Sequence, residues 1–196
     1  MTESVLLKKS DYLKDSITIQ TVIAAGLVAL AVLLPLAVHS FLGAEGGMRW
    51  LPMYLPVLLG GCILGWKWGI GIGALSPLVS FAITALFGNA MPALSRIPYM
   101  LVELCVFALV AGAFSKKIVK NIWFALPAVV LAQVCGRGAF LVSSAIFQGV
   151  SSLSFVQAWT QVQTGISGIL LQVVFVPAFL VVVRKVFSGE GEERNL

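Results

Sequence analysis

The chain has 196 residues, of which 59% are hydrophobic and only 11% are charged. A soluble domain carries about 25% charged residues, and a chain of this length must cover most of its outside with polar groups if that outside is water. The composition therefore excludes a soluble globular protein and predicts an integral membrane protein. A net charge of +5 would suit nucleic acid in a soluble protein. Here the basic residues flank apolar runs, which is the pattern that orients a membrane chain, so no nucleic-acid partner is expected.

The apolar runs predict an all-α membrane protein, a bundle of six transmembrane helices forming a single domain over residues 1–196. The predicted spans are residues 17–41, 51–64, 68–87, 97–114, 122–147 and 165–187. Each span except the second is long enough to cross about 30 Å of hydrocarbon as a helix. The first apolar run follows a polar N-terminal stretch and is about 20 residues long, so we expect a retained helix and no cleaved signal.

The second span is short, and Pro52 and Pro56 disturb its first turn. Irregular backbone at membrane depth is tolerated where it is buried in protein or lines a cavity. A topology of five spans with one re-entrant segment therefore competes with the six-span topology.

Glycines recur at intervals of four across the turn between the second and third spans, at Gly61, Gly65, Gly69 and Gly73. Small residues at this spacing share one helix face and let a second helix approach closely. We therefore expect this hairpin to be tightly packed.

Basic residues are distributed unevenly between the two ends of the spans. If the N-terminus is cytoplasmic, the outer side holds only Arg49 and Arg96, and Arg137 lies within the fifth span. The cytoplasmic side then holds Lys8, Lys9, Lys14, Lys67, Lys116, Lys117, Lys120, Arg184, Lys185 and Arg194. This positive-inside bias predicts a multi-pass protein of the bacterial plasma membrane with both termini in the cytoplasm.

Two ionisable residues interrupt the apolar spans. Counted from the outer end, Glu103 lies about five residues into the fourth span and Arg137 about eleven residues into the fifth, or roughly 8 and 16 Å deep. A charge at such depth costs several kcal/mol unless it is paired or hydrated, so both side chains should face the interior. They either line a polar pocket open to the outside or form a structural ion pair between the two spans, and the two interpretations are compatible.

Other polar and aromatic residues converge on the same outer half of the chain. They are Met48, Trp50, Tyr54, Asn89, Arg96, Tyr99, Gln133, Trp159, Gln163 and Gln172. Aromatic faces with a few hydrogen-bonding groups suit a small heteroaromatic ligand. Because Trp and Tyr also serve as interfacial anchors, only the convergence of these residues supports a binding site.

The sequence lacks the residue combinations that catalysis or metal binding requires. His39 is the only histidine, no aspartate lies within a span, and Glu103 is the only carboxylate available there. The three cysteines show no disulfide or metal-site spacing, and there is no P-loop pattern. We therefore expect no enzyme activity, no metal site and no cofactor.

The stretch LPMYLPVLLGGCILGWKWGIGIGALSPLVS, followed by PYMLVELCVFALVAGAFSK, resembles the substrate-binding S-components of energy-coupling factor (ECF) transporters. The resemblance runs from the first span to the sixth. It implies six helices with cytoplasmic termini and an outward ligand pocket, built from the connection between spans 1 and 2 and from spans 4 to 6. It also implies a lid around residues 48–54 and pocket positions at Glu103, Arg137 and Gln172. Ala25 and Ala29 match the motif by which S-components dock on their transmembrane partner.

The function that this resemblance implies is high-affinity capture of a vitamin or vitamin precursor from outside for an ECF-type ABC importer. A transmembrane subunit and two ATPase subunits would supply the energy, which accounts for the missing nucleotide motif. The candidate ligands are pyridoxine-like molecules, thiamine precursors, pantothenate and cobalamin-related molecules. Tyr54 stands where many relatives have histidine, and the adjoining Glu103 and Arg137 favour a neutral or zwitterionic ligand over a polyanion.

Two functions of other classes stay open. In a self-sufficient secondary transporter, Glu103 would be the proton site that couples uptake to an ion gradient. In a structural membrane subunit, Glu103 and Arg137 would only hold the assembly together, and no small molecule would bind.

Overall fold

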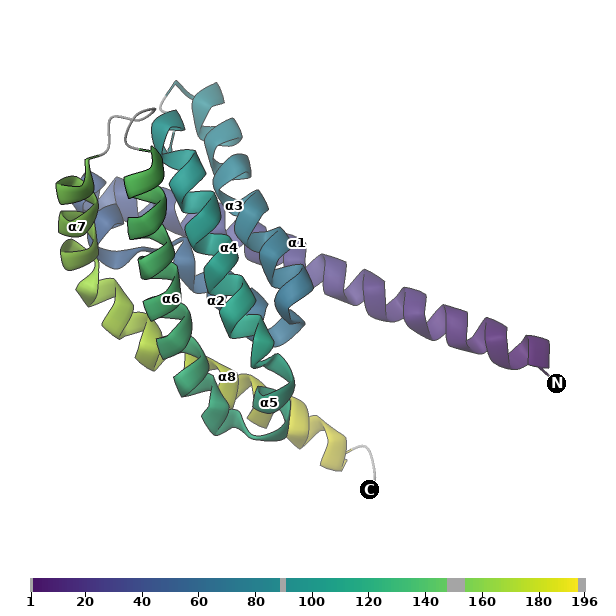
Figure 1. Cartoon of the computed structure of the whole chain (residues 1–196). Coiled ribbons are helices and arrows are strands. Elements are labelled where there is room, and N and C mark those ends of the chain that lie inside the picture. The colour runs from purple at the N-terminus through teal and green to yellow at the C-terminus, as the bar shows by residue number, and fades with distance from the viewer. Residues whose placement is uncertain (1, 89–90, 148–153, 194–196) are drawn as a thin grey trace.

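The computed structural model describes residues 2–88, 91–147 and 154–193, and of residues 2–15, 44 and 186–193 it describes the backbone alone. Over these ranges the regular structure is helical and includes no strand. The helices form a bundle, from which the N-terminal part of α1 (Thr2–Trp50) projects (Figure 1). The predicted all-α fold is confirmed.

Six helical segments of the described chain are long and apolar enough to cross a membrane. They are Ser16–Gly43, Glu45–Leu64, Trp66–Leu86, Leu94–Ala113, Ile122–Ile146 and Ile166–Lys185. These segments coincide with the six predicted spans, and the second is longer than predicted because helical structure begins before its prolines.

The other helices follow α1 in chain order. They are α2 (Tyr54–Leu64), α3 (Trp66–Leu86), α4 (Ile97–Ala113), α5 (Ser115–Lys120), α6 (Ala125–Ile146), α7 (Phe155–Thr164) and α8 (Ile166–Glu193). Two 3₁₀ turns, Leu94–Arg96 and Ile122–Phe124, lead into α4 and α6.

The second span contains a break in its helical backbone. α1 bends at Gly43, where φ is 67°, and its final segment ends at Trp50. Leu51 follows with a φ of 50°, and α2 begins only at Tyr54. The left-handed region is sterically costly for a leucine, so contacts from elsewhere in the fold must hold this turn.

α4 forms the centre of the bundle, where it packs against α2, α3 and α6. Its Leu104, Phe107, Ala108 and Ala111 are each 0% exposed. Residues three and four apart lie on one face of a helix, so these four form a continuous buried stripe. The stripe brings α4 close to its neighbours and fixes where Glu103, one residue before it, points.

Gly61, Gly69 and Gly73 of the α2–α3 hairpin stand where a side chain would clash with a neighbouring helix. A Cβ atom at Gly69 would lie 2.9 Å from Gly61 Cα, and one at Gly73 would lie 2.8 Å from the Leu104 carbonyl oxygen. Gly112 of α4 is tighter still, because a Cβ there would lie 2.4 Å from Trp66 backbone atoms. The close packing predicted for this hairpin is confirmed, and it extends to α4.

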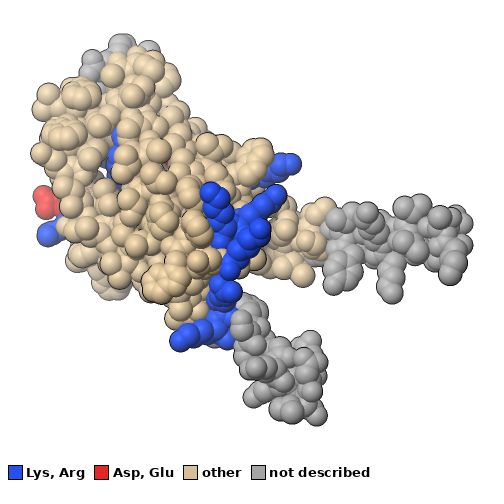
Figure 2. Space-filling model, turned by 60° about the horizontal axis from the view of Figure 1, so that its bottom comes forward, with Lys and Arg blue, Asp and Glu red and all other residues tan. Residues whose placement is uncertain are grey.

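Basic side chains gather at one end of the bundle (Figure 2). The described basic residues of this end are Lys67, Lys116, Lys117, Lys120, Arg184 and Lys185. Arg96 lies directly before α4, at the opposite end of the bundle, and Arg49 lies beside Gly168 near the start of α8. The two ends of the bundle therefore differ strongly in positive charge.

Candidate ligand-binding site

Glu103 on α4 and Arg137 on α6 form an ion pair inside the bundle. Arg137 Nη1 lies 2.7 Å from Glu103 Oε1. Glu103 is 0% exposed and Arg137 8%. Their burial confirms the prediction that both residues face the interior. α4 and α6 pack along each other, which brings the two side chains together.

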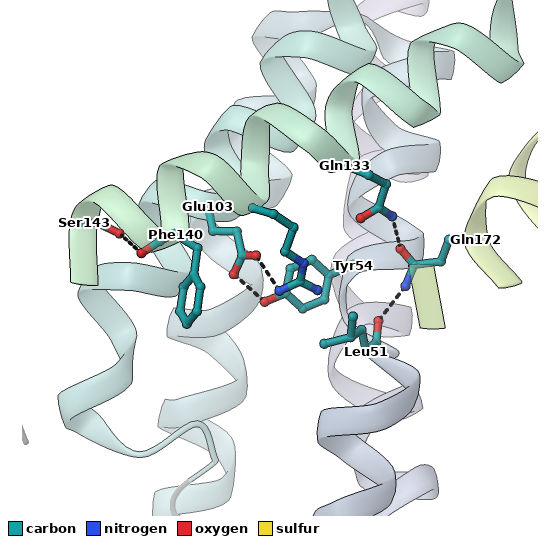
Figure 3. Close-up of polar contacts among 8 residues, drawn as sticks. Leu51, Tyr54, Glu103, Gln133, Phe140, Ser143 and Gln172 are labelled. Carbon is teal, nitrogen blue, oxygen red and sulfur yellow. Dashed lines mark hydrogen bonds and ion pairs between the residues drawn. The ribbon is translucent and has the colours of Figure 1, made fainter. Parts of the chain in front are cut away.

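Tyr54 of α2 completes this cluster. Its hydroxyl donates a hydrogen bond to Glu103 Oε2 over 2.6 Å (Figure 3). Arg137 Cζ lies 4.9 Å from the centroid of the Tyr54 ring, a distance at which a cation is attracted to an aromatic face. Each carboxylate oxygen of Glu103 therefore has a donor, and three helices meet at one buried charge.

Arg137 keeps unused donors after this pairing. Its Nε and Nη2 atoms are buried and have no hydrogen-bond partner in the described part of the chain. The same holds for Gln133 Oε1 and Tyr99 Oη. Buried polar groups are nearly always satisfied in proteins, so the two unpaired nitrogens of Arg137 mark a position where a ligand or water is expected.

Two glutamines link α6 and α8 to the irregular turn before α2. Gln133 Nε2 donates to Gln172 Oε1 over 2.6 Å, and Gln172 Nε2 donates to the Leu51 carbonyl oxygen over 3.0 Å (Figure 3). Gln133 and Gln172 are 3% and 1% exposed. This buried chain of hydrogen bonds holds Leu51 in its left-handed conformation.

A cavity of about 340 Å³ adjoins Arg137. Its walls come from the middle and end of α1, the turn before α2, the start of α2, α3, the segment before α4, and α4, α6 and α7. The lining residues include Pro35, His39, Met48, Leu51, Pro52, Met53, Tyr54, Met91, Pro92, Arg96, Met100, Arg137, Phe140 and Gln161. The irregular backbone predicted from Pro52 therefore does line a cavity, as membrane-depth backbone of this kind requires.

The segment before α4 is tied to α3 at the cavity wall. Met91 N donates to Thr84 Oγ1 over 2.7 Å, and Ser80 Oγ donates to the Met91 carbonyl oxygen over 2.9 Å. These hydrogen bonds place Met91 beside the cavity although it lies in a connection between spans.

The residues predicted for the site fall into three groups. Met48, Tyr54, Arg96 and Arg137 line the cavity. Glu103 and Gln172 are buried and bind Arg137 and Leu51, which line it, whereas Gln133 is buried and bound to Gln172. The remaining described ones are Trp50, Tyr99, Trp159 and Gln163, which do not line it.

Tyr99 is 1% exposed and packs edge-on against Phe140 and Phe147. Trp50 and Trp159 are 36% and 48% exposed. Asn89 lies outside the described residues.

Sequence reasoning did not select several residues that line the cavity. Met100 lies three residues before Glu103, and Phe140 lies three residues after Arg137. Residues at this spacing share a helix face, so the position of the ionisable pair could have identified both. His39 also lines the cavity.

Ala25 and Ala29, the predicted docking residues, are exposed on α1. They line a second, strongly apolar cavity of about 610 Å³ between α1 and α3, together with residues such as Val28, Trp68 and Leu75. An apolar groove of this size on a membrane helix suits lipid chains or another helix.

No family model, no curated protein and no solved structure matches the chain. The resemblance to S-components of ECF transporters stays a prediction from the sequence. Among the described residues, no three His, Cys, Asp or Glu side chains are grouped so that they could hold a metal ion.

Proposed function

We propose that the chain is the substrate-binding subunit of an ECF-type ABC importer and captures a vitamin or vitamin precursor from outside. The observation that carries this proposal is the cavity of about 340 Å³ beside a buried arginine with unused donors. Its volume lies at the small end of the range for ligand sites, and its apolar walls with a few polar groups are typical of them. The predicted candidates of this size are pyridoxine-like molecules, thiamine precursors and pantothenate.

The distribution of charge supports an outward-facing cavity. Arg96 lines the cavity, whereas the lysines of α5 lie at the other end of α4. If the lysine-rich end is cytoplasmic, as the positive-inside rule favours, the cavity opens toward the outside of a bacterial plasma membrane.

Residues 48–54, where the helical backbone of the second span is broken, can act as a lid. Met48, Leu51 and Met53 line the cavity from this segment, and Gln172 holds its backbone at Leu51. A ligand would enter when residues 48–54 move outward, and their return would exclude water from it.

The groove at Ala25 and Ala29 is proposed as the docking surface for the transmembrane subunit. Small side chains allow a partner helix to approach closely, and the groove is lined by apolar residues. Two ATPase subunits bound to that partner would drive release of the ligand inward.

A tryptophan-fluorescence titration of the detergent-purified chain tests the proposal. Trp50 directly precedes Leu51 of the cavity wall, so its emission should report occupancy. The panel contains pyridoxine, pantothenate, thiamine precursors and cobalamin. We expect one compound to give a saturable change that Arg137→Ala removes and that Arg184→Ala, at an exposed arginine away from the cavity, retains. No saturable change with any compound would contradict the proposal.

The complete burial of Glu103 favours a second candidate, an ion-coupled secondary transporter with this carboxylate as its proton site. Uptake of substrate by the chain alone in liposomes, driven by a pH gradient and lost in Glu103→Gln, would support it over the importer subunit.

A further inference from the structure

The two unused nitrogens of Arg137 belong to one edge of its guanidinium group. Nη1 is occupied by Glu103 Oε1 at 2.7 Å, whereas Nε and Nη2 have no partner among the described residues. Nη2 is the terminal nitrogen on the side of the Nε–H bond, so the two groups present parallel donors. This spacing matches the two oxygens of a carboxylate, which such an edge binds in a bidentate manner.

The other charges around the cavity do not compete for this edge. Glu103 is fully engaged, because Tyr54 donates to its second oxygen over 2.6 Å. The described residues that line the cavity include two arginines, Arg96 and Arg137, and no aspartate or glutamate. The cavity therefore carries positive charge and no carboxylate, so a negatively charged acceptor would come from the ligand, and it would reach the buried Nε and Nη2 as the side chains that cover them move aside.

Most of the remaining wall is apolar and adaptable. Four of the five methionines of the chain line the cavity, namely Met48, Met53, Met91 and Met100. Phe140 adds an aromatic side chain. Methionine fills irregular gaps and tolerates different shapes, so this wall suits a compact apolar or heteroaromatic body.

We propose that the captured molecule is a small monocarboxylate with an apolar or heteroaromatic body, and that its carboxylate binds Nε and Nη2 of Arg137. This inference rests on the proposed function and specifies its substrate class. One carboxylate restores the hydrogen bonds that the buried guanidinium lacks, and the body displaces water from the methionine wall. A polyanion would exceed the positive charge available, because the charge of Arg137 is already shared with Glu103.

The test uses matched pairs of probes that differ in one group. Nicotinate, pantothenate and biotin are compared with nicotinamide, pantothenol and biotin amide, and pyridoxine is added as a neutral vitamin. The protein is the full chain in detergent with ¹⁵N-labelled arginine, and the Nε–H resonance of Arg137 is assigned by its loss in Arg137→Lys. Binding is measured by titration, and the resonance reports contact with that nitrogen.

We expect at least one acid to shift the Arg137 Nε–H resonance saturably and to bind roughly tenfold to a hundredfold more tightly than its neutral counterpart. Arg137→Lys keeps the charge but not the parallel donors, so the advantage of the acid should disappear. Arg184→Lys, at an exposed arginine of α8 that does not line the cavity, should retain it.

Two outcomes overturn the inference in different ways. If a neutral probe binds as tightly as its acid, or pyridoxine binds and the acids do not, the inference is wrong and the proposed function stands. If no probe of either kind binds, the proposed function fails and the inference fails with it. The comparison of probes uses the unaltered chain, so it remains decisive if Arg137→Lys does not fold.

Discussion

The Tyr54 hydroxyl donates to Glu103 Oε2 over 2.6 Å, although the two residues are 49 positions apart in the chain. Tyr54 begins α2, directly after the broken backbone, and Glu103 lies on the central helix. This hydrogen bond therefore fastens the start of α2 to the buried ion pair. It links the proposed lid to the group that holds Arg137 in place.

Tyr54→Phe should destabilise the fold by about 1.5–3 kcal/mol, the range for a hydrogen bond to a charged group. The ring would still pack on Phe107, whose centroid lies 5.2 Å away. Tyr99→Phe is a matched control, because the Tyr99 hydroxyl is buried without a partner in the described residues, and its removal should cost nothing measurable. Thermal unfolding in detergent measures the stability of both variants. An equal loss of stability in Tyr54→Phe and Tyr99→Phe would contradict a stabilising hydrogen bond from Tyr54 to Glu103.

Glu103→Ala should cost about 3–5 kcal/mol, because it leaves the Arg137 charge buried without its partner. The double exchange Glu103→Arg with Arg137→Glu should recover part of this stability. It should not recover ligand binding, because the guanidinium then projects from α4 instead of α6. Thermal unfolding measures stability and fluorescence titration measures ligand binding, so the two effects can be separated. Recovery of full function by the exchanged pair would favour a purely structural role.

Gln172→Leu should remove the hydrogen bond that Gln172 Nε2 donates to the Leu51 carbonyl oxygen over 3.0 Å, and should leave that oxygen with the Tyr54 N–H as its donor. Because Leu51 has a left-handed backbone, we expect residues 48–54 to exchange amide hydrogens faster and ligand to dissociate faster. Hydrogen-exchange mass spectrometry and stopped-flow dissociation measure these changes. Gln163→Leu, at an exposed position of α7, should change neither, and a similar effect of both substitutions would contradict a specific role for Gln172.

Gly112→Ala should destabilise the chain by about 1–3 kcal/mol, since its Cβ would lie 2.4 Å from Trp66 backbone atoms. Gly71→Ala meets nothing within 4 Å and should be neutral or stabilising by up to about 1 kcal/mol, because alanine favours a helix. Thermal unfolding of the two variants gives the comparison. An unchanged melting temperature in Gly112→Ala would refute the close approach of α3 and α4.

Ala25→Trp should prevent association with a transmembrane partner while it leaves ligand binding intact. Ala25 lines the groove between α1 and α3, which shares none of its lining residues with the cavity at Arg137. Co-purification with the candidate partner and fluorescence titration of the lone chain measure the two activities. Joint loss of both would count against separate docking and binding surfaces.

Hydropathy predicted the six apolar helices, and the cost of burying a charge predicted an interior position for Glu103 and Arg137. Both predictions need only the residue types within one apolar run. The face that a short helix presents was harder to predict. Ala158 is buried and Gln161 lines the cavity, whereas Trp159 and Gln163 lie on the exposed side of the same helix, α7. Three-residue spacing puts the first two on one face.

A local signal for α7 was present in the sequence. Ser154 and Gln157 form a capping box, in which the Gln157 N–H donates to Ser154 Oγ over 3.3 Å and the Ser154 N–H donates to Gln157 Oε1 over 3.1 Å. A serine followed three residues later by glutamine marks a helix start. By contrast, the hydrogen bond from Gln172 to the Leu51 carbonyl oxygen joins residues 121 positions apart, and no local pattern predicts it.

Native mass spectrometry of the chain released from detergent micelles tests the central claim most directly, because it needs no prior choice of ligand. We predict a small-molecule adduct on the chain as purified from its own cells, absent in Arg137→Ala and present in Arg184→Ala. Detection of the bare chain alone in all three proteins, each shown to be folded, would contradict a ligand-binding function for this cavity.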